Sequence, residues 1–155
     1  MTTIEDLYKM ARLSPSDIHE HVPILRLYAG QCTHVTEFGT RRGVSTVAFL
    51  AARPKRLVCY DIVRRPKTAE GLKVAAELCG VDFTFHEADT LKVVIEPTEL
   101  LFIDTLHTGE QLSEELRLHA NAAGRFILLH DTVTYGLTGQ RNNSTGLIAA
   151  IEAFL

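Results

Sequence analysis

The chain has 155 residues, of which 46% are hydrophobic and 23% are charged. This composition and length suit one compact globular domain. The net charge of −3 gives no electrostatic basis for binding nucleic acid, and no apolar run approaches the ~20 residues of a membrane-spanning helix. Cys32, Cys59 and Cys79 are widely spaced without a CxxC pair, which indicates neither a zinc knuckle nor a disulfide framework. We therefore expect a cytoplasmic protein.

The first 30 residues form a helical leading segment. Apolar positions recur at helical spacing in residues 3–12, and a second helix is expected at 22–29, with Pro23 in its first turn and Gly30 at its end.

From residue 34 to residue 155, strands and helices alternate. The apolar patterns predict strands at 34–38, 57–61, 82–86, 100–104 and 125–131, helices at 45–52, 68–78, 108–122 and 145–155, and a loop at 132–144. Such alternation predicts an α/β, Rossmann-like three-layer sandwich, with a parallel sheet between two layers of helices. Right-handed crossovers favour the strand order 3-2-1-4-5. A ligand is then expected at the carboxyl ends of the strands, near the switch between strands 1 and 4.

The first strand leads into a glycine turn with the sequence EFGTRRGVS, residues 37–45. Gly39 and Gly43 allow close approach of a ligand to backbone N–H groups at the start of a helix. The dinucleotide-binding motif G-x-G-x-x-G requires a glycine where this chain has Arg41, and the Arg41 side chain would crowd a pyrophosphate. Glu37 suits an ammonium group instead, so we expect a ligand with a positive charge near the turn.

Acidic residues stand at the ends of four predicted strands and directly after the third. Their mutual repulsion at one rim would call for a cation or for ligand donors. Asp61 follows the turn by about 20 residues, the spacing at which an acid reaches ribose hydroxyls. Asp89 has two interpretations, as part of a ligand-binding loop or as the cap of the next helical turn. The acids are Glu37, Asp61, Glu87, Asp89, Asp104 and Asp131.

Residues 37–45 resemble the first motif of class I S-adenosylmethionine (SAM)-dependent methyltransferases. Residues 102–110 (FIDTLHTGE) and 129–132 (LHDT) are similar to the small O-methyltransferase branch that includes the cephalosporin hydroxylase-like group, and the resemblance covers most of the chain from Ser16 onward. It implies methylation of a hydroxyl on a small molecule or sugar. The implied cofactor-binding residues are Glu37, Gly39, Thr40, Gly43, Ser45, Asp61, Asp89 and Thr90.

The same resemblance implies a divalent metal, Mg²⁺ or another, on Asp104, His130 and Asp131. His130 stands where relatives have a glutamate, and a histidine with two carboxylates suits Mn²⁺, Fe²⁺ or Zn²⁺ at least as well as Mg²⁺. Asp104 and His107 are the expected catalytic residues, with His107 as general base. The alternative for His107 is a histidine at a helix N-terminus that local hydrogen bonds satisfy. His19 and His21 are candidates for lining an acceptor site in the leading segment.

Three alternatives share this fold: an NAD(P)-dependent oxidoreductase, a non-catalytic cofactor-binding domain, and a metal-dependent enzyme of another reaction type. Methyltransferases of the resembling class usually add two strands after the fifth, and here the last two strands are missing from the sequence. The fifth strand is then an apolar edge without lysine or proline. We expect either that the chain is a fragment of a longer protein, whose further C-terminal segment covers this edge, or that it forms a homodimer. The fragment is favoured.

Overall fold

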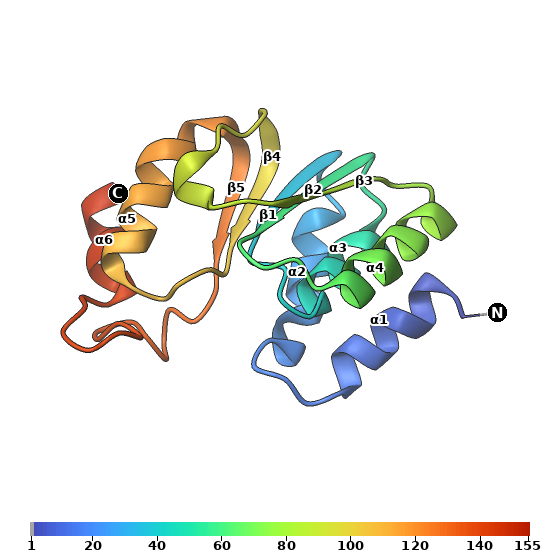
Figure 1. The fold of residues 1–155 in the computed structure, drawn as a ribbon, viewed down its shortest axis with the longest axis horizontal. Helices are drawn as coiled ribbons and strands as arrows, with labels where there is room; N and C mark the ends of the chain where they lie inside the picture. The colour runs from blue at the N-terminus through green and yellow to red at the C-terminus, as the bar shows by residue number, and fades with distance from the viewer. Residues whose placement is uncertain (1) are drawn as a thin grey trace.

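A computed structural model describes residues 2–155 as a five-stranded, fully parallel sheet between two layers of helices (Figure 1). The strand order β3-β2-β1-β4-β5 confirms the predicted topology. β3 and β5 are the two edges, and the order reverses between β1 and β4, where strand ends leave room for a ligand. The strands are β1 (His34–Phe38), β2 (Arg56–Asp61), β3 (Asp82–Glu87), β4 (Thr98–Ile103) and β5 (Ala123–Leu129).

Helices cover both faces of the sheet, so the central strands β1, β2 and β4 bury side chains on both sides. α1 (Ile4–Leu13), α2 (Val22–Ala29), α3 (Val44–Ala52) and α4 (Pro66–Cys79) pack on one face, and α5 (Gly109–His119) and α6 (Leu147–Phe154) pack on the other (Figure 1). Two apolar cores result, one on each face. Short 3-10 turns connect these elements: η1 (His19–His21), η2 (Thr90–Lys92) and η3 (Ala120–Ala122).

The helix ends follow the local sequence. Thr3 and Asp6 form a capping box at the start of α1, which satisfies backbone N–H groups that the first turn leaves free. Gly80 ends α4 with a φ of 72°, a left-handed conformation that glycine adopts without strain.

Several element boundaries differ from the sequence-based prediction, and the three that matter here lie after residue 108. β5 ends at Leu129, so His130 and Asp131 lie in the turn beyond it, and Asp131 has a φ of 57°. The fifth helix ends at His119 and continues as η3. α6 begins at Leu147, because the carbonyl of Thr145 accepts a hydrogen bond from Gly109 and the segment before α6 packs on α5 instead of joining the helix.

β5 is an apolar edge strand, as expected. Phe126 and Leu128 pack against one core, and Ile127 and Leu129 pack against the other. The guanidinium of Arg125 lies 5.0 Å from the centre of the Phe126 ring, a contact that the sequence analysis did not anticipate. No helix in the described part of the chain is long and apolar enough to span a membrane.

Candidate functional site

The turn between β1 and α3 brings the main chain close to β4. Gly39 and Gly43 have φ angles of 88° and 79°, which favour glycine. A Cβ on Gly39 would also collide with the carbonyl oxygen of Asp104, so this position needs glycine for space. Arg41 adopts a positive φ of 46° and its N–H donates to Oδ2 of Asp61 at 2.7 Å. The turn is therefore tied to both neighbouring strand ends.

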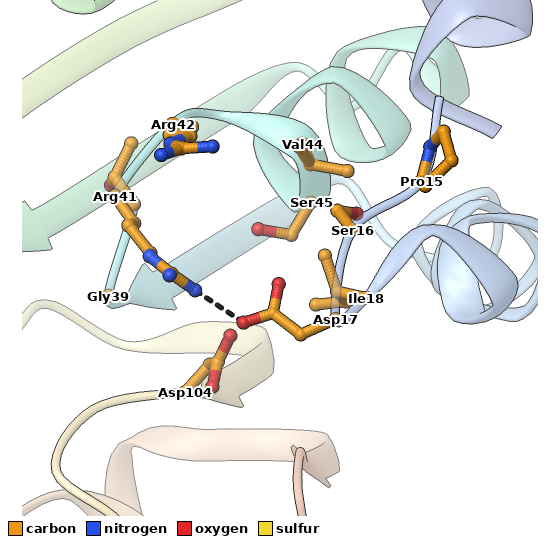
Figure 2. A pocket seen from close by; sticks show the side chains of 11 residues that line it. Pro15, Ser16, Asp17, Ile18, Gly39, Arg41, Arg42, Val44, Ser45 and Asp104 are labelled. Carbon is orange, nitrogen blue, oxygen red and sulfur yellow. Dashed lines mark hydrogen bonds and ion pairs between the residues drawn. The ribbon is translucent and has the colours of Figure 1, made fainter. Parts of the chain in front are cut away.

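Two adjoining cavities open at the carboxyl ends of the strands. The first, of about 280 Å³, lies between the glycine turn and the segment that precedes η1 (Figure 2). The second, of about 460 Å³, extends over the ends of β2 and β4 toward α5. Gly39, Arg41 and Asp104 line both, so the two cavities form one cleft. It crosses the switch between β1 and β4, where the strand order predicts a ligand.

The cleft brings together most of the residues that the sequence predicts for the cofactor. Gly39, Thr40 and Ser45 line the first cavity. Asp61, Asp89 and Thr90 line the second. Glu37 and Gly43 line neither, and a Cβ on Gly43 would approach the Leu72 side chain at 3.0 Å. Gly43 therefore serves packing of the turn on α4.

Glu37 points away from the cleft, contrary to the expectation that it faces an ammonium group. Its side chain is fully buried and accepts hydrogen bonds from Ser45 Oγ at 2.5 Å, Thr46 Oγ1 at 2.6 Å and Cys59 Sγ at 3.0 Å. Burial, which outweighs these hydrogen bonds, raises the pKa of Glu37 to about 7. The carboxyl group thus fastens the start of α3 to β1 and β2.

The acids of the second cavity are partly engaged by the backbone. Asp61 also accepts from the N–H of Val63 at 2.9 Å. Asp89 accepts a hydrogen bond from the N–H of Leu91 at 3.0 Å and caps η2. Asp89 is therefore the cap of the next helical turn, which was one of its two interpretations. Its carboxylate lines the cavity as well.

An ion pair crosses the first cavity. The guanidinium of Arg41 bonds to the carboxylate of Asp17, which lies on the segment before η1 (Figure 2). Asp17 was not among the predicted site residues. It belongs to a Ser-Pro-Ser-Asp stretch that reads as a helix breaker, and no local pattern indicates that it reaches the glycine turn.

Beside the cleft, two acids and two histidines gather around one point. Asp104, His107, His130 and Asp131 each offer a ligand atom, and these four atoms lie within 4.8 Å of one another. Nε2 of His107 lies 2.9 Å from Asp104 and 3.3 Å from Asp131, and Nδ1 of His130 lies 3.3 Å and 3.4 Å from the same two carboxylates. We call these residues the His–Asp cluster. The three residues predicted as metal ligands and the predicted base thus share one site.

The carboxylates and the histidines of the cluster shift one another's pKa values. Burial disfavours a charge on Asp104, but the hydrogen bond from His107 and the proximity of His130 outweigh it and lower the pKa to about 2. Burial likewise disfavours protonation of both histidines, yet Asp104 and Asp131 raise the pKa of each above the ordinary 6.5. Protons on the histidines or a bound cation would balance the two carboxylates.

Both histidines are held in place by neighbours. The ring of His107 stacks on Tyr135 with centres 4.9 Å apart, and its Nδ1 lies 3.1 Å from Oε1 of Gln140. His130 packs edge-to-face on His21 at 5.1 Å, and both line a third cavity of about 230 Å³ between α2 and the residues after β5. His19 instead bonds within its own turn, to the carbonyl of Ser16.

Comparison with solved structures finds close matches in architecture. The O-methyltransferase TomG from Streptomyces achromogenes, solved in complex with SAM, is 18% identical over 99% of this chain and 76% of its own, with a TM-score of 0.65. An O-methyltransferase from Bacillus cereus in complex with S-adenosylhomocysteine is 18% identical over 97% and 76%, with a TM-score of 0.64. This chain has the class I methyltransferase fold.

Not every protein with this methyltransferase fold acts on a hydroxyl group. The N-methyltransferase NodS from Bradyrhizobium japonicum is 15% identical over 87% of this chain and 79% of its own, with a TM-score of 0.61. At such identities the likeness establishes the fold, and the chemistry has to come from the site. No protein-family model matches the sequence, and a comparison with curated proteins gives no significant match.

Several cleft residues have no sequence signal. Leu106, Gln111, Gln140 and Arg141 line the second cavity. Gln140 and Arg141 come from the Gly/Thr/Asn-rich segment between β5 and α6, for which sequence predicts only a loop. Their place over the cleft depends on how that loop folds back, as in the bond from the Gln140 N–H to the carbonyl of His107 at 2.7 Å.

Proposed function

We propose that this protein is a SAM-dependent methyltransferase that methylates a hydroxyl group of a small molecule or sugar. One observation carries the proposal: in a class I methyltransferase fold, a single cleft runs from Asp61 across the glycine turn to Asp104, which belongs to the His–Asp cluster. A cofactor in this cleft and an acceptor at the cluster would meet beside Asp104. An NAD(P)-dependent oxidoreductase is disfavoured because Arg41 occupies the place where a pyrophosphate needs glycine.

The chain's own residues provide binding and orientation. Gly39, Thr40 and Ser45 would hold the amino-acid end of the cofactor, Asp61 the ribose hydroxyls, and Asp89 with Thr90 the base. Bound SAM supplies a methyl group that its sulfonium already activates, so the protein mainly has to align the acceptor and remove a proton. Glu37 supports this site indirectly, by fixing the first turn of α3.

His107 is suited to take the acceptor's proton. Its Nδ1 lies 3.1 Å from Oε1 of Gln140, and its Nε2 lies 2.9 Å from Asp104 and 3.3 Å from Asp131. To act as a base the ring must be neutral, because a neutral imidazole keeps one nitrogen with a free lone pair. The two carboxylates would stabilise the imidazolium that forms after proton transfer.

The cluster also fits a divalent cation. Among residues 2–155, Nδ1 of His130 is buried without a hydrogen-bond partner and lies between two carboxylates, which is the environment of a metal ligand. Asp104, His130 and Asp131 would hold the ion, and the nitrogen donor favours Mn²⁺, Fe²⁺ or Zn²⁺ alongside Mg²⁺. A bound cation would lower the pKa of an acceptor hydroxyl and fix its position.

Calorimetric titration tests the cofactor assignment. S-adenosylhomocysteine should bind more tightly than NAD, and Asp61→Ala should weaken it by about tenfold or more, because a hydrogen bond to a charged acceptor contributes about 1.5–3 kcal/mol. Asp82→Ala is the matched control, since Asp82 pairs with Arg56 at the other end of the sheet. Tight NAD binding, or equal affinity of wild type and Asp61→Ala, would contradict the proposal.

Anomalous diffraction from crystals soaked in Mn²⁺ tests the metal. A peak surrounded by Asp104, His130 and Asp131 is expected, and Asp131→Asn should weaken it. If saturating Mn²⁺ leaves no peak, these residues act as a hydrogen-bonding set.

A further inference from the structure

α5 carries a stripe of polar side chains on its buried face. Gln111, Glu115 and His119 follow one another at intervals of four residues, which places them on one side of a helix. Glu115 is 0% exposed and His119 is 1% exposed, although this face packs against the sheet beside Leu112 and Leu116. Burying a carboxyl group is costly unless donors satisfy it, so the partners of Glu115 indicate what it does.

Every hydrogen-bond donor of Glu115 lines the second cavity. Thr90 Oγ1 donates to Oε1 at 2.6 Å, Thr105 Oγ1 donates to Oε2 at 2.8 Å, and Gln111 Nε2 donates to Oε1 at 3.0 Å. Thr90, Thr105 and Gln111 all belong to that cavity's wall. Burial, opposed by these three donors, raises the pKa of Glu115 above its ordinary value.

The three donors come from different parts of the fold. Thr90 belongs to η2, which follows β3 and lies beside α5 (Figure 1). Thr105 directly follows Asp104 of the His–Asp cluster, in the loop after β4. His119 adds a second grip on η2, because its Nε2–H donates to the carbonyl of Thr90 at 2.7 Å. One buried carboxyl group therefore joins two loops that both contribute to the wall of the cavity.

We propose that Glu115 is a positioning residue that sets the spacing of the η2 loop and the Asp104–Thr105 loop, and with it the affinity for the adenosine part of the cofactor. The identity of the ligand rests on the proposed function. The positioning of the two loops rests on the hydrogen bonds that Glu115 makes. Glu115 itself is buried behind the cavity wall, so it acts through Thr90 and Thr105 and touches no ligand.

Two hydroxyl deletions and one amide replacement test this role. Thr105→Val and Thr90→Val keep the side-chain shape but remove a donor to Glu115, and Glu115→Gln keeps the size but loses one acceptor oxygen. Each should weaken both S-adenosylhomocysteine and 5′-methylthioadenosine by about tenfold. Thr105→Ser restores the hydroxyl and should restore the affinity, which a general loss of packing would not allow.

Glu114→Gln is the control, because the adjacent Glu114 is partly exposed and pairs only with Arg117 on the same helix. It should bind both ligands as the wild type does. The positioning role is overturned if Glu115→Gln and Thr105→Val bind both ligands with wild-type affinity, or if Glu114→Gln loses as much as they do.

Hydrogen exchange of the ligand-free protein separates this inference from the proposed function. Amides of residues 88–92 and 104–107 should exchange faster in Glu115→Gln and Thr105→Val than in wild type or Glu114→Gln. Faster exchange together with no binding of either ligand by the wild type would refute the proposed cofactor while supporting the positioning role. Unchanged exchange in both variants would overturn the positioning role whatever the wild type binds.

Discussion

The buried carboxyl group of Glu37 should make stability depend on pH in a specific window. Its pKa is about 7 in the folded protein, against an ordinary value of 4.5. Between these values the folded state keeps a proton that the unfolded state has released. Stability from this group is therefore complete below pH 4.5, falls as the pH rises toward 7, and is constant above that.

The expected size follows from the two pKa values. The interval from 4.5 to about 7 corresponds to about 3 kcal/mol, at about 1.4 kcal/mol for each pH unit. Glu37→Gln keeps the size of the side chain and removes the titration. The difference in unfolding free energy between wild type and Glu37→Gln should therefore shift by about 2–3 kcal/mol against the wild type from pH ~5 to pH ~8.

Urea denaturation at several pH values measures this difference. The contributions of all other titrating groups to the free energy of unfolding are common to both proteins and cancel in it. Glu99→Gln is a suitable control. Glu99 lies at the other end of the sheet, and hydrogen bonds from Thr33 and the backbone lower its pKa. The difference in unfolding free energy between wild type and Glu99→Gln should therefore stay constant from pH ~5 to pH ~8. A flat difference for Glu37→Gln as well would show that Glu37 is not held as the structure indicates.

Three further outcomes are expected. In the same urea assay, Gly39→Ala should lower the free energy of unfolding by about 1–3 kcal/mol or more, because of the positive φ and the collision with Asp104. Gly71→Ala, in open space within α4, should raise it by up to about 1 kcal/mol. Asp17→Asn should change stability by less than about 1 kcal/mol, since its pair with Arg41 is more than half exposed, and a larger loss in thermal unfolding would mean that the pair fixes the whole leading segment. Light scattering should detect self-association through the β5 edge that increases in Arg125→Ala, and a strict monomer at high concentration in both proteins would argue against an open edge.

Sequence periodicity predicted most of the fold because the central strands are buried on both faces and the helices end at clear signals. β1 and α2 have the predicted boundaries, and the strand order follows from right-handed crossovers. Strand alternation also contains the information that was missed for Glu37. Val35 and Glu37 are two residues apart and therefore share the face under α3, so the Glu37 side chain turns under the helix and not into the cleft.

The α5 polar stripe could not be recognised from sequence for a different reason. Polar residues at four-residue intervals on a helix usually mark its solvent-exposed face, and residues 108–122 read simply as an amphipathic helix. Only the fold shows that η2 and the loop after β4 supply hydroxyl donors to this face. The contact between Asp17 and Arg41 is missed similarly, because it joins segments whose relation depends on the packing of α1 and α2.

The acids at the strand ends are not one repelling set, although the sequence places them on one rim. Three of them have their own compensation: hydroxyl and thiol donors for Glu37, backbone N–H groups for Asp61, and a backbone N–H with Lys92 for Asp89. Asp104 and Asp131 differ, because they meet two histidines around a common point. Counting acids in the sequence would assign a cation to the whole rim. The donors in the structure confine that need to the His–Asp cluster, where a proton or a metal ion can balance the charge.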